Sequence, residues 1–289
     1  MRVTQGSINA STLRGLQMSL GRVQDLQAQL SSGKRIQVPS DDPSATASAM
    51  TYRSQQAADE QYLRNVDQVS ARLGVTDDTL TSLSDRLRDV RQLMVQAQSG
   101  AISNEARTAL SAQASAVRDE VVGLFNTTYL DRPVFGGTVP GQQAVDPATG
   151  AYVGNDAPIV SRISHDATIR VDVKGTDVGA DTTPALLDRI VTDLASPSGV
   201  PAADFTDLDA EMSKVLQTLG DVGARSARVE TTKTNVQSHS LDLKSRISEN
   251  EDVDLPATIM NLQAQQVGYQ SALGASAKIL QTSLLDFLK

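Results

Sequence analysis

The sequence predicts a mainly α protein: a long antiparallel helical coiled-coil bundle made from both ends of the chain, with a small β-rich insert. Three observations support this fold class. Apolar residues repeat at alternating steps of four and three over long stretches, which is the spacing of a coiled-coil seam. Proline is missing from 44–130 and from 202–255. Aromatic residues make up only 3% of the 289 residues, too few for an ordinary thick globular core.

An N-terminal amphipathic helix is the first predicted element. Its apolar residues recur at helical spacing up to Ser31-Ser32, and the following Gly33 is the residue type that most often ends a helix. Such a stripe needs a partner surface, because only one face of the helix is apolar. The stripe consists of Leu13, Leu16, Leu20, Val23, Leu26 and Leu30.

A long helix is predicted from Pro43 to about Ser99. Asp42 supplies its N-cap and Pro43 its first-turn proline. At ~1.5 Å per residue this helix would be roughly 85 Å long. A further helix from about Ser103 should lie antiparallel to it, because the connection through Gly100 is short. The seam of the long helix runs through Val66, Val69, Leu73, Thr76, Leu80, Leu83, Leu87, Val90, Met94 and Ala97.

The composition changes between Asp131 and Asp204. This segment holds seven of the ten prolines, eight of the 19 glycines, and ten Asp against five basic residues. Alternating apolar residues flank a turn candidate at His165-Asp166, which is typical of half-exposed strands. The apolar spacing of 184–195 predicts a short helix. We therefore expect a loop-rich, β-rich outer insert over 131–203.

A second long helix is predicted after the insert, with Asp204 as its N-cap. Its seam from Leu208 to Ile247 repeats the 4-3 spacing, so it can pack against the earlier helices. The frame shifts at Asp254-Leu255-Pro256, which marks a separate C-terminal amphipathic helix. The predicted apolar stripe of that helix consists of Leu255, Ile259, Leu262, Tyr269, Leu273, Leu280, Leu284 and Phe287.

Three domains follow from these elements. We expect a terminal coiled-coil domain from 1–42 and 251–289, a helical rod domain from 43–130 and 204–250, and the outer insert 131–203. The two terminal stripes offer more apolar surface than a single helix pair can cover. Sister copies of the chain are therefore expected to supply the missing surface.

Composition and motifs exclude several function classes. The chain has 34 acidic against 26 basic residues, which argues against nucleic-acid binding. It has no cysteine and only two histidines, His165 and His239, so the sequence offers no metal-ligand cluster and no nucleophile with a base. The acidic runs 40–42 and 249–254 are interpreted as caps rather than cation loops. No apolar run is long enough to span a membrane. We expect no catalytic residues, no cofactor and no metal.

A signature motif lies between the first two predicted helices, with the sequence Gly33-Lys34-Arg35-Ile36-Gln37-Val38-Pro39-Ser40-Asp41-Asp42-Pro43. It resembles the N-terminal signature of the flagellin superfamily, in the form typical of its members at the hook–filament junction. Two further matches follow in the family's order, at 126–137 and from Glu251 to the C-terminal amphipathic helix. The similarity covers 1–137 and 205–289, but Leu130-Asp131-Arg132 departs from the family's usual Gly-Arg-Tyr. The signature residues are Gly33, Lys34, Arg35, Pro39, Asp41, Asp42 and Pro43.

The resemblance implies a structural protein rather than an enzyme. Such proteins are exported by the flagellar type III apparatus after a cytoplasmic chaperone has held the C-terminal helix. A ring of copies then joins the hook-side junction protein to the flagellin filament, outside the cell. The terminal helices form the inner tube, so their apolar stripes would be the subunit-packing residues.

Two alternatives remain open at this stage. Flagellin itself, the filament subunit, shares the superfamily signature. A cytoplasmic signalling coiled coil has similar seams, but its heptads should continue through the centre, where the insert interrupts them. The pair Lys34-Arg35 is compatible with an ionic contact between subunits or with a solvated loop.

Overall fold

The structure of the chain is a computed structural model that describes residues 5–98, 103–139, 141 and 143–287, with the backbone alone at 5–9 and 278–287. By its internal contacts the chain forms two compact units. One unit combines Met1–Ala57 with Ser240–Lys289, and the other is Ala58–His239. The three predicted domains stay a prediction.

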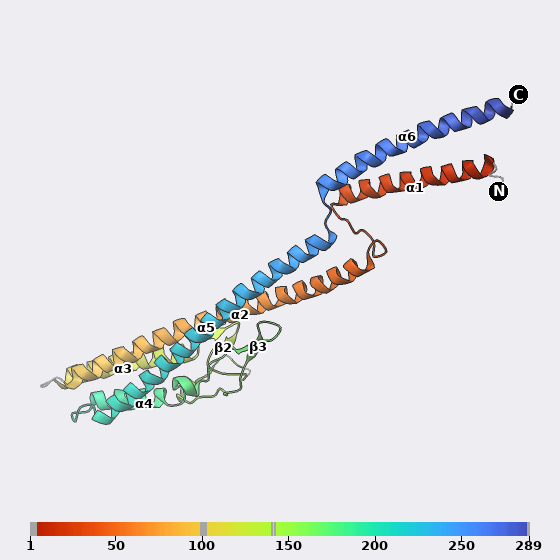
Figure 1. The fold of residues 1–289 in the computed structure, drawn as a ribbon. Coiled ribbons are helices and arrows are strands. Elements are labelled where there is room, and N and C mark those ends of the chain that lie inside the picture. Colours follow the sequence, from red (N-terminus) through yellow and green to blue (C-terminus); the bar gives the residue numbers. More distant parts are fainter. Residues whose placement is uncertain (1–4, 99–102, 140, 142, 288–289) are drawn as a thin grey trace. The chain divides into compact units, whose positions relative to one another are not determined.

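Helices dominate the described residues, and the predicted mainly α fold class is confirmed (Figure 1). The strands form two small antiparallel sheets, β1–β2 and β3–β4. The helices are α1 (Gln5–Ser32), α2 (Pro43–Gln98), α3 (Asn104–Phe125), α4 (Thr183–Ala195), α5 (Ala202–Glu251) and α6 (Leu255–Phe287). The strands are β1 (Thr128–Tyr129), β2 (Arg132–Pro133), β3 (Val160–Arg162) and β4 (Thr168–Arg170), and a 3-10 turn, η1, spans Thr176–Val178.

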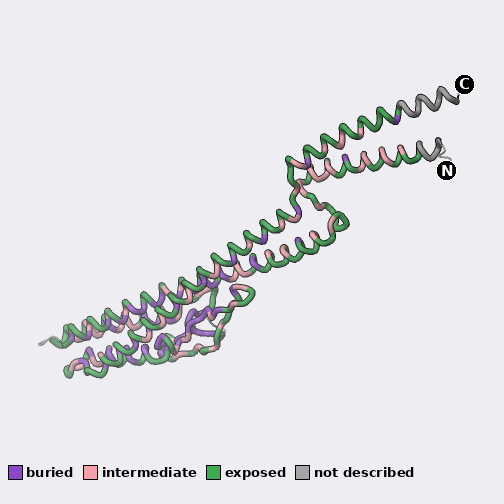
Figure 2. The backbone as a smooth tube through the Cα atoms, in the orientation of Figure 1, coloured by how far each residue is buried: buried purple, intermediate pink, exposed green. Residues whose placement is uncertain are grey.

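The predicted seam of α2 forms the centre of the hydrophobic core. Every seam residue from Val66 to Ala97 is at most 3% exposed. The α5 seam is buried with it at Leu208, Val215 and Val222, in one cluster that includes α3 and the insert. Figure 2 shows this buried stretch along α2, α3 and α5. The 4-3 spacing therefore correctly predicted which side of each long helix is covered.

The starts of the helices confirm one predicted cap and correct another. Asp42 accepts a hydrogen bond from the Ala45 amide at 3.0 Å, and Ser103 caps α3. The prediction that Asp204 caps α5 was wrong, because the helix already begins at Ala202, directly after Pro201. The Asp204 carboxylate instead lies buried and accepts a hydrogen bond from the Arg189 guanidinium at 2.8 Å.

The insert contains the predicted hairpin and helix. Strands β3 and β4 pair in antiparallel register around the His165-Asp166 turn, and α4 covers the predicted 184–195. The strands are short, so loops held by side chains make up much of this region. Asn126 is one such anchor: its side chain donates to the Val145 carbonyl at 2.8 Å and accepts from the Ala144 amide at 2.7 Å.

The β1–β2 connection is a tight two-residue turn with unusual residues. Leu130 and Asp131 have φ angles of 50° and 59°, so both occupy the left-handed region that favours glycine and asparagine. The turn lies where this sequence has Leu130-Asp131-Arg132 in place of the Gly-Arg-Tyr that is usual in the resembled family. The turn also leaves the Leu130 side chain 74% exposed.

Candidate assembly surface

The terminal helices α1 and α6 pack against each other in the first unit (Figure 1). The Gln265 side-chain amide of α6 donates to the Ser19 hydroxyl of α1 at 2.9 Å. Val23 is the buried member of the predicted α1 stripe, at 8% exposure. The pair therefore has a contact line, although few of its side chains are fully covered (Figure 2).

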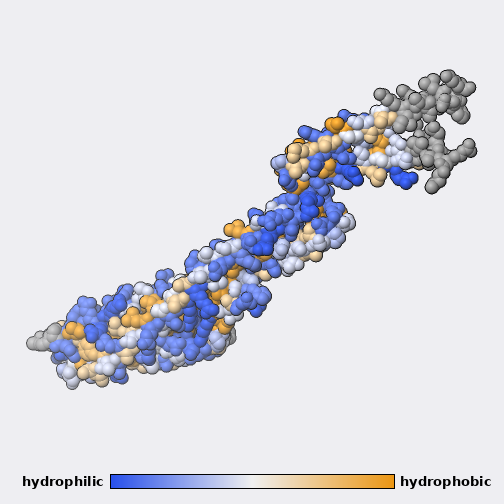
Figure 3. Space-filling view, in the orientation of Figure 1, coloured by the Kyte–Doolittle hydropathy of each residue, from blue (hydrophilic) through white to orange (hydrophobic). Residues whose placement is uncertain are grey.

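The predicted stripes are only partly buried by this pairing. Five of their residues are half-buried, namely Leu16, Leu26, Leu30, Leu262 and Tyr269. Five others are at least 40% exposed: Leu13, Leu20, Leu255, Ile259 and Leu273. The side chains of Leu280, Leu284 and Phe287 lie outside the described residues. Hydrophobic patches are visible on the face of this pair in Figure 3.

Apolar residues outside the predicted stripes enlarge this exposed surface. Met18 of α1 and Met260 and Val267 of α6 are 60–65% exposed. The 33-residue α6 contains only two charged residues, Lys278 and Asp286. Exposed helices normally carry charges on their solvent face, so an exposed apolar surface with so few charges predicts an interaction site.

A second feature of the same unit joins the signature loop to the α5–α6 break. Gly33 has a φ of 68° and ends α1 in the left-handed conformation. Backbone hydrogen bonds then run from the Arg35 amide to the Glu251 carbonyl at 2.6 Å and from the Val253 amide to the Gly33 carbonyl at 3.0 Å. We call this connection, formed by 33–35 and 251–253, the clasp.

Glu251 is the charged centre of the clasp. Its side chain is 8% exposed and accepts Lys34 Nζ at 3.0 Å and Arg53 Nη2 at 2.6 Å. The hydrogen bond to Glu251, and to a smaller extent the one to Asp252, raises the pKa of Lys34 above its usual value. Arg35 donates to the Asn250 carbonyl at 2.8 Å. Lys34 and Arg35 thus make their contacts within one chain.

Two carboxylates shape the rest of the signature loop. Asp41 accepts the amides of Gln37 and Val38 at 2.9 and 3.0 Å, and these two bonds lower its pKa. The Ala45 amide, followed by the Ser44 hydroxyl, lowers the pKa of Asp42. Both carboxylates therefore hold backbone amides of the same segment, and Asp42 is the helix cap that the sequence predicted. Pro39 lies exposed at its tip.

Comparison with known proteins agrees with this arrangement. The bacterial flagellin N-terminal helical region matches residues 4–133, and the bacterial flagellin C-terminal helical region matches 205–288. Together they cover most of the chain on both sides of the insert. The chain belongs to the flagellin family. This membership confirms the predicted resemblance and makes the chain a structural component of the bacterial flagellum.

Individual relatives match this flagellin-family chain over nearly its full length. Flagellar hook-associated protein 3 of Salmonella typhimurium is 23% identical over 94% of this chain and 95% of that protein. A flagellin of Listeria innocua is 23% identical over 98% and 96%. A solved flagellar hook-associated protein of Vibrio parahaemolyticus aligns with a TM-score of 0.65 at 19% identity, over 73% of this chain and 100% of that one. This structural likeness supports the fold.

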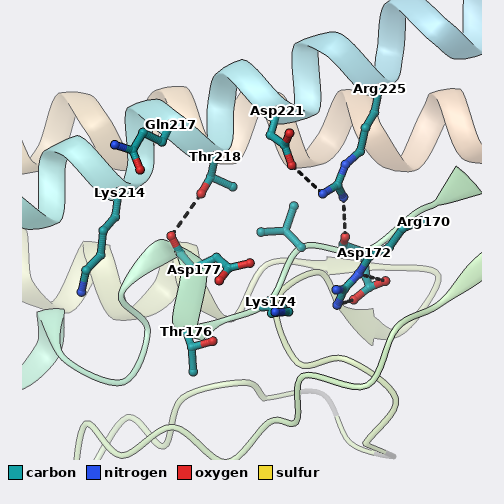
Figure 4. Close-up of a pocket in the computed structure, with 11 residues that line it drawn as sticks. Arg170, Asp172, Lys174, Thr176, Asp177, Lys214, Gln217, Thr218, Asp221 and Arg225 are labelled. Carbon is teal, nitrogen blue, oxygen red and sulfur yellow. Dashed lines mark hydrogen bonds and ion pairs between the residues drawn. The ribbon is translucent and has the colours of Figure 1, made fainter.

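The other polar sites of this flagellin-family chain hold its parts together. Figure 4 shows a pocket between α5 and the insert, where Arg225 donates to the Asp221 carboxylate and to the Asp172 carbonyl. Thr218 donates to the carbonyl of Asp177 on η1 at 3.1 Å. These bonds connect the insert to α5. Among the described residues, no group of acids and histidines could hold a metal ion, and no helix could cross a membrane.

The clasp predicts a measurable effect of Glu251→Gln. The amide keeps the shape of the side chain but removes the negative charge that Lys34 and Arg53 share. Both cations are half-exposed and can be rehydrated, so we expect a local loss of about 1 kcal/mol rather than unfolding. Amide exchange at Arg35 and Val253 should accelerate about five-fold, and exchange in the α2 seam should not change. Unchanged exchange at both amides would contradict the clasp.

The signature loop is expected to loosen in acid. The folded-state pKa of Asp41 lies below its usual 3.8, so this carboxylate stabilises the loop above that pH and loses its effect as the pH falls through the folded-state pKa. Proton chemical shifts of the Gln37 and Val38 amides should report this titration. In Asp41→Asn the same amides should show no such transition; a transition that persists in that variant would assign it to another group.

Proposed function

We propose that this flagellin-family chain is the subunit that joins hook to filament, assembling with copies of itself through α1 and α6. The main support is the exposed apolar surface of the two terminal helices. It consists of stripe residues with the spacing that α2 buries completely, yet the single chain leaves Leu13, Leu20, Leu255, Ile259 and Leu273 at least 40% exposed. Packing against further copies would remove this apolar area from water.

The junction is favoured over the filament itself by the signature loop and the insert. The loop has the Pro39–Pro43 form that resembles junction members, and two hook-associated protein 3 relatives match 94% and 100% of this chain. Flagellin is the second candidate, because a Listeria flagellin matches over 98% of this chain. The insert over 131–203 is small for an exposed filament domain, which also favours the junction.

The same resemblance supports the proposed partners and route. The chain would be exported by the flagellar type III apparatus, after a cytoplasmic chaperone has held its C-terminal helix. Its partners would then be other copies in a ring, the hook-side junction protein and flagellin. We place 1–42 with 251–289 in the inner tube, 43–130 with 204–250 in the next shell, and the insert outside. The clasp would set the connection between terminal and long helices within each copy.

Labelling on intact cells tests this assignment. A small epitope replaces Pro147–Thr149 in a loop of the insert, and the cells are examined by immunogold electron microscopy. A band confined to the base of each filament is expected for the junction subunit. Label along the filament would instead identify flagellin, and label restricted to the cytoplasm in swimming cells would exclude both.

A further inference from the structure

A pocket of about 360 Å³ lies in the second unit, between α2 and the two hairpins. Helix α2 contributes Gln68, Val69 and Arg72. The β1–β2 hairpin contributes Tyr129, Leu130 and Arg132. The remaining wall is apolar or neutral and consists of Ile159, Val160, Ser161 and Val171. We call this site the Arg72 pocket. Its lining contains two arginines and no acidic residue, although the whole chain has a net charge of −8.

Arg72 carries a buried guanidinium, two of whose nitrogens have no hydrogen-bond partner within the chain. The residue is 7% exposed, and its Nε and Nη2 atoms have no hydrogen-bond partner among the described residues. Burial lowers the pKa of Arg72, Asp172 opposes this effect, and the charge of Arg132 adds to it. A guanidinium stays protonated under these conditions, so the folded chain retains this cation in a poorly solvated place.

The nearest buried carboxylate does not satisfy Arg72. Asp172 is fully buried, but its oxygens accept Arg170 at 2.6 and 3.0 Å and the Ile159 amide at 2.6 Å. No hydrogen bond or ion pair joins it to Arg72 among the described residues. Natural proteins keep an unpaired buried guanidinium rarely, because removing its hydration is costly. An anion from outside this chain would satisfy the two unpaired nitrogens of Arg72.

The rim of the pocket indicates that a protein supplies this anion. Leu130 is 74% exposed and is held in a left-handed conformation, which is strained for a leucine. Strained residues of this kind gather at binding sites. Tyrosine and arginine, here Tyr129 and Arg132, are the residue types enriched in the energetic centres of protein interfaces. A small anion alone would leave Leu130 uncovered.

We propose that the Arg72 pocket receives an aspartate or glutamate side chain from a second copy of this chain. The carboxylate would take the free N–H groups of Arg72 and Arg132, since guanidinium and carboxylate match as planar, bidentate partners. Its methylene group would meet Val69 and Val171, and the adjoining backbone would cover Leu130. The segment 131–204 has ten Asp against five basic residues, so a neighbouring insert offers many candidate acids.

This inference rests on the proposed function in one respect, namely that copies lie side by side. Self-association of the full-length chain is measured by sedimentation for the wild type, Arg72→Met and Arg132→Gln. We expect the dissociation constant to rise about ten-fold or more in both variants, because each leaves the incoming carboxylate short of a charged donor. Arg162→Gln removes a cation from β3 outside the pocket. It should change the dissociation constant by less than two-fold.

Folding is monitored separately from association. Methionine at position 72 replaces an unpaired buried charge with an apolar chain of similar length, so the monomer should unfold at an equal or higher temperature than the wild type. Weaker association together with an undiminished unfolding temperature supports the pocket. An association constant that all three variants leave unchanged would overturn it.

Cross-linking identifies the source of the carboxylate. Arg132→Lys keeps the charge and allows a carbodiimide to form an amide with a nearby acid, with loss of water. In a mixture of ¹⁴N- and ¹⁵N-labelled copies, we expect mixed-isotope peptides that link position 132 to an Asp or Glu of another copy. Links within one copy only would overturn the proposal.

A small-molecule occupant would also be recognised. Saturable stabilisation of the dilute monomer by isobutyrate or inorganic phosphate, lost in Arg72→Met and without any link between copies, would make the pocket a small-anion site and refute the second-copy occupant. If Arg72→Met and Arg132→Gln build normal hook–filament junctions, this inference fails while the proposed function stands. Failure of the terminal helices to matter for assembly would refute the proposed function instead.

Discussion

Cells whose only copy of this chain carries Ile259→Asp and Leu273→Asp are expected to be non-motile and to lack attached filaments. The two side chains are 45% and 43% exposed in the single chain, so two added charges have little to disturb there. In an assembly the same positions would become buried between helices of neighbouring copies. Burying two unpaired carboxylates would then cost several kcal/mol in every subunit.

The matched control for this double variant is Leu216→Asp on α5. Leu216 is also a leucine, is 45% exposed, and belongs to the second unit rather than to the terminal helices. Cells that carry Leu216→Asp should swim normally. Purified double variant should retain the wild-type urea unfolding transition of the 58–239 unit while remaining monomeric at concentrations where the wild type associates. Normal swimming of the double variant would remove the terminal helices from the proposed function.

The helical part of the fold was predictable from sequence because its rules are local. A step of three or four residues places side chains on one side of a helix, and the absence of proline lets that side continue. The positions predicted in this way, from Val66 to Met94, are the buried ones. Caps were less secure: Asp42 follows the expected pattern, but α5 already begins at Ala202, so Asp204 lies inside the helix and does not cap it.

The clasp and the Arg72 pocket could not be predicted in the same way. Lys34 and Glu251 are 217 positions apart, and nothing in the spacing of either residue indicates the other. Arg72 stands beside a seam position, where an arginine ordinarily reaches solvent along the surface. Its burial depends on the hairpin turn at Leu130, whose left-handed geometry does not follow from a leucine and an aspartate in sequence.

The assembly surface and its need for further copies were predicted from the sequence, and the structure adds how far the single chain covers each residue. The stripes in α1 and α6 have the same heptad spacing as the stripe in α2, and only the structure shows that α2 is covered while Ile259 and Leu273 are exposed. Spacing determines which face of a helix is apolar, and the number of available neighbours determines whether that face is buried. An apolar helix face that the single chain leaves exposed, as in α1 and α6, therefore indicates where another copy packs.

A second large effect is expected in the buried α2 seam. Truncation of one leucine there should lower the stability of the single chain. Leu80 is fully buried in the α2 seam, within the core formed with α3 and α5. Leu80→Ala removes three carbon atoms from a closely packed site and leaves a cavity, which should lower the free energy of unfolding by about 2–5 kcal/mol. Urea unfolding monitored by circular dichroism measures this loss.

The same truncation at exposed positions provides the comparison. Leu216→Ala on α5 and Leu273→Ala on α6 create no cavity in the single chain, so each should change its unfolding free energy by less than about 0.5 kcal/mol. We expect Leu273→Ala to weaken self-association nonetheless, whereas Leu216→Ala should leave it unchanged. If Leu273→Ala destabilised the monomer as much as Leu80→Ala, the α6 stripe would be a completed core, and its leucines could not be the surface that joins one copy to the next.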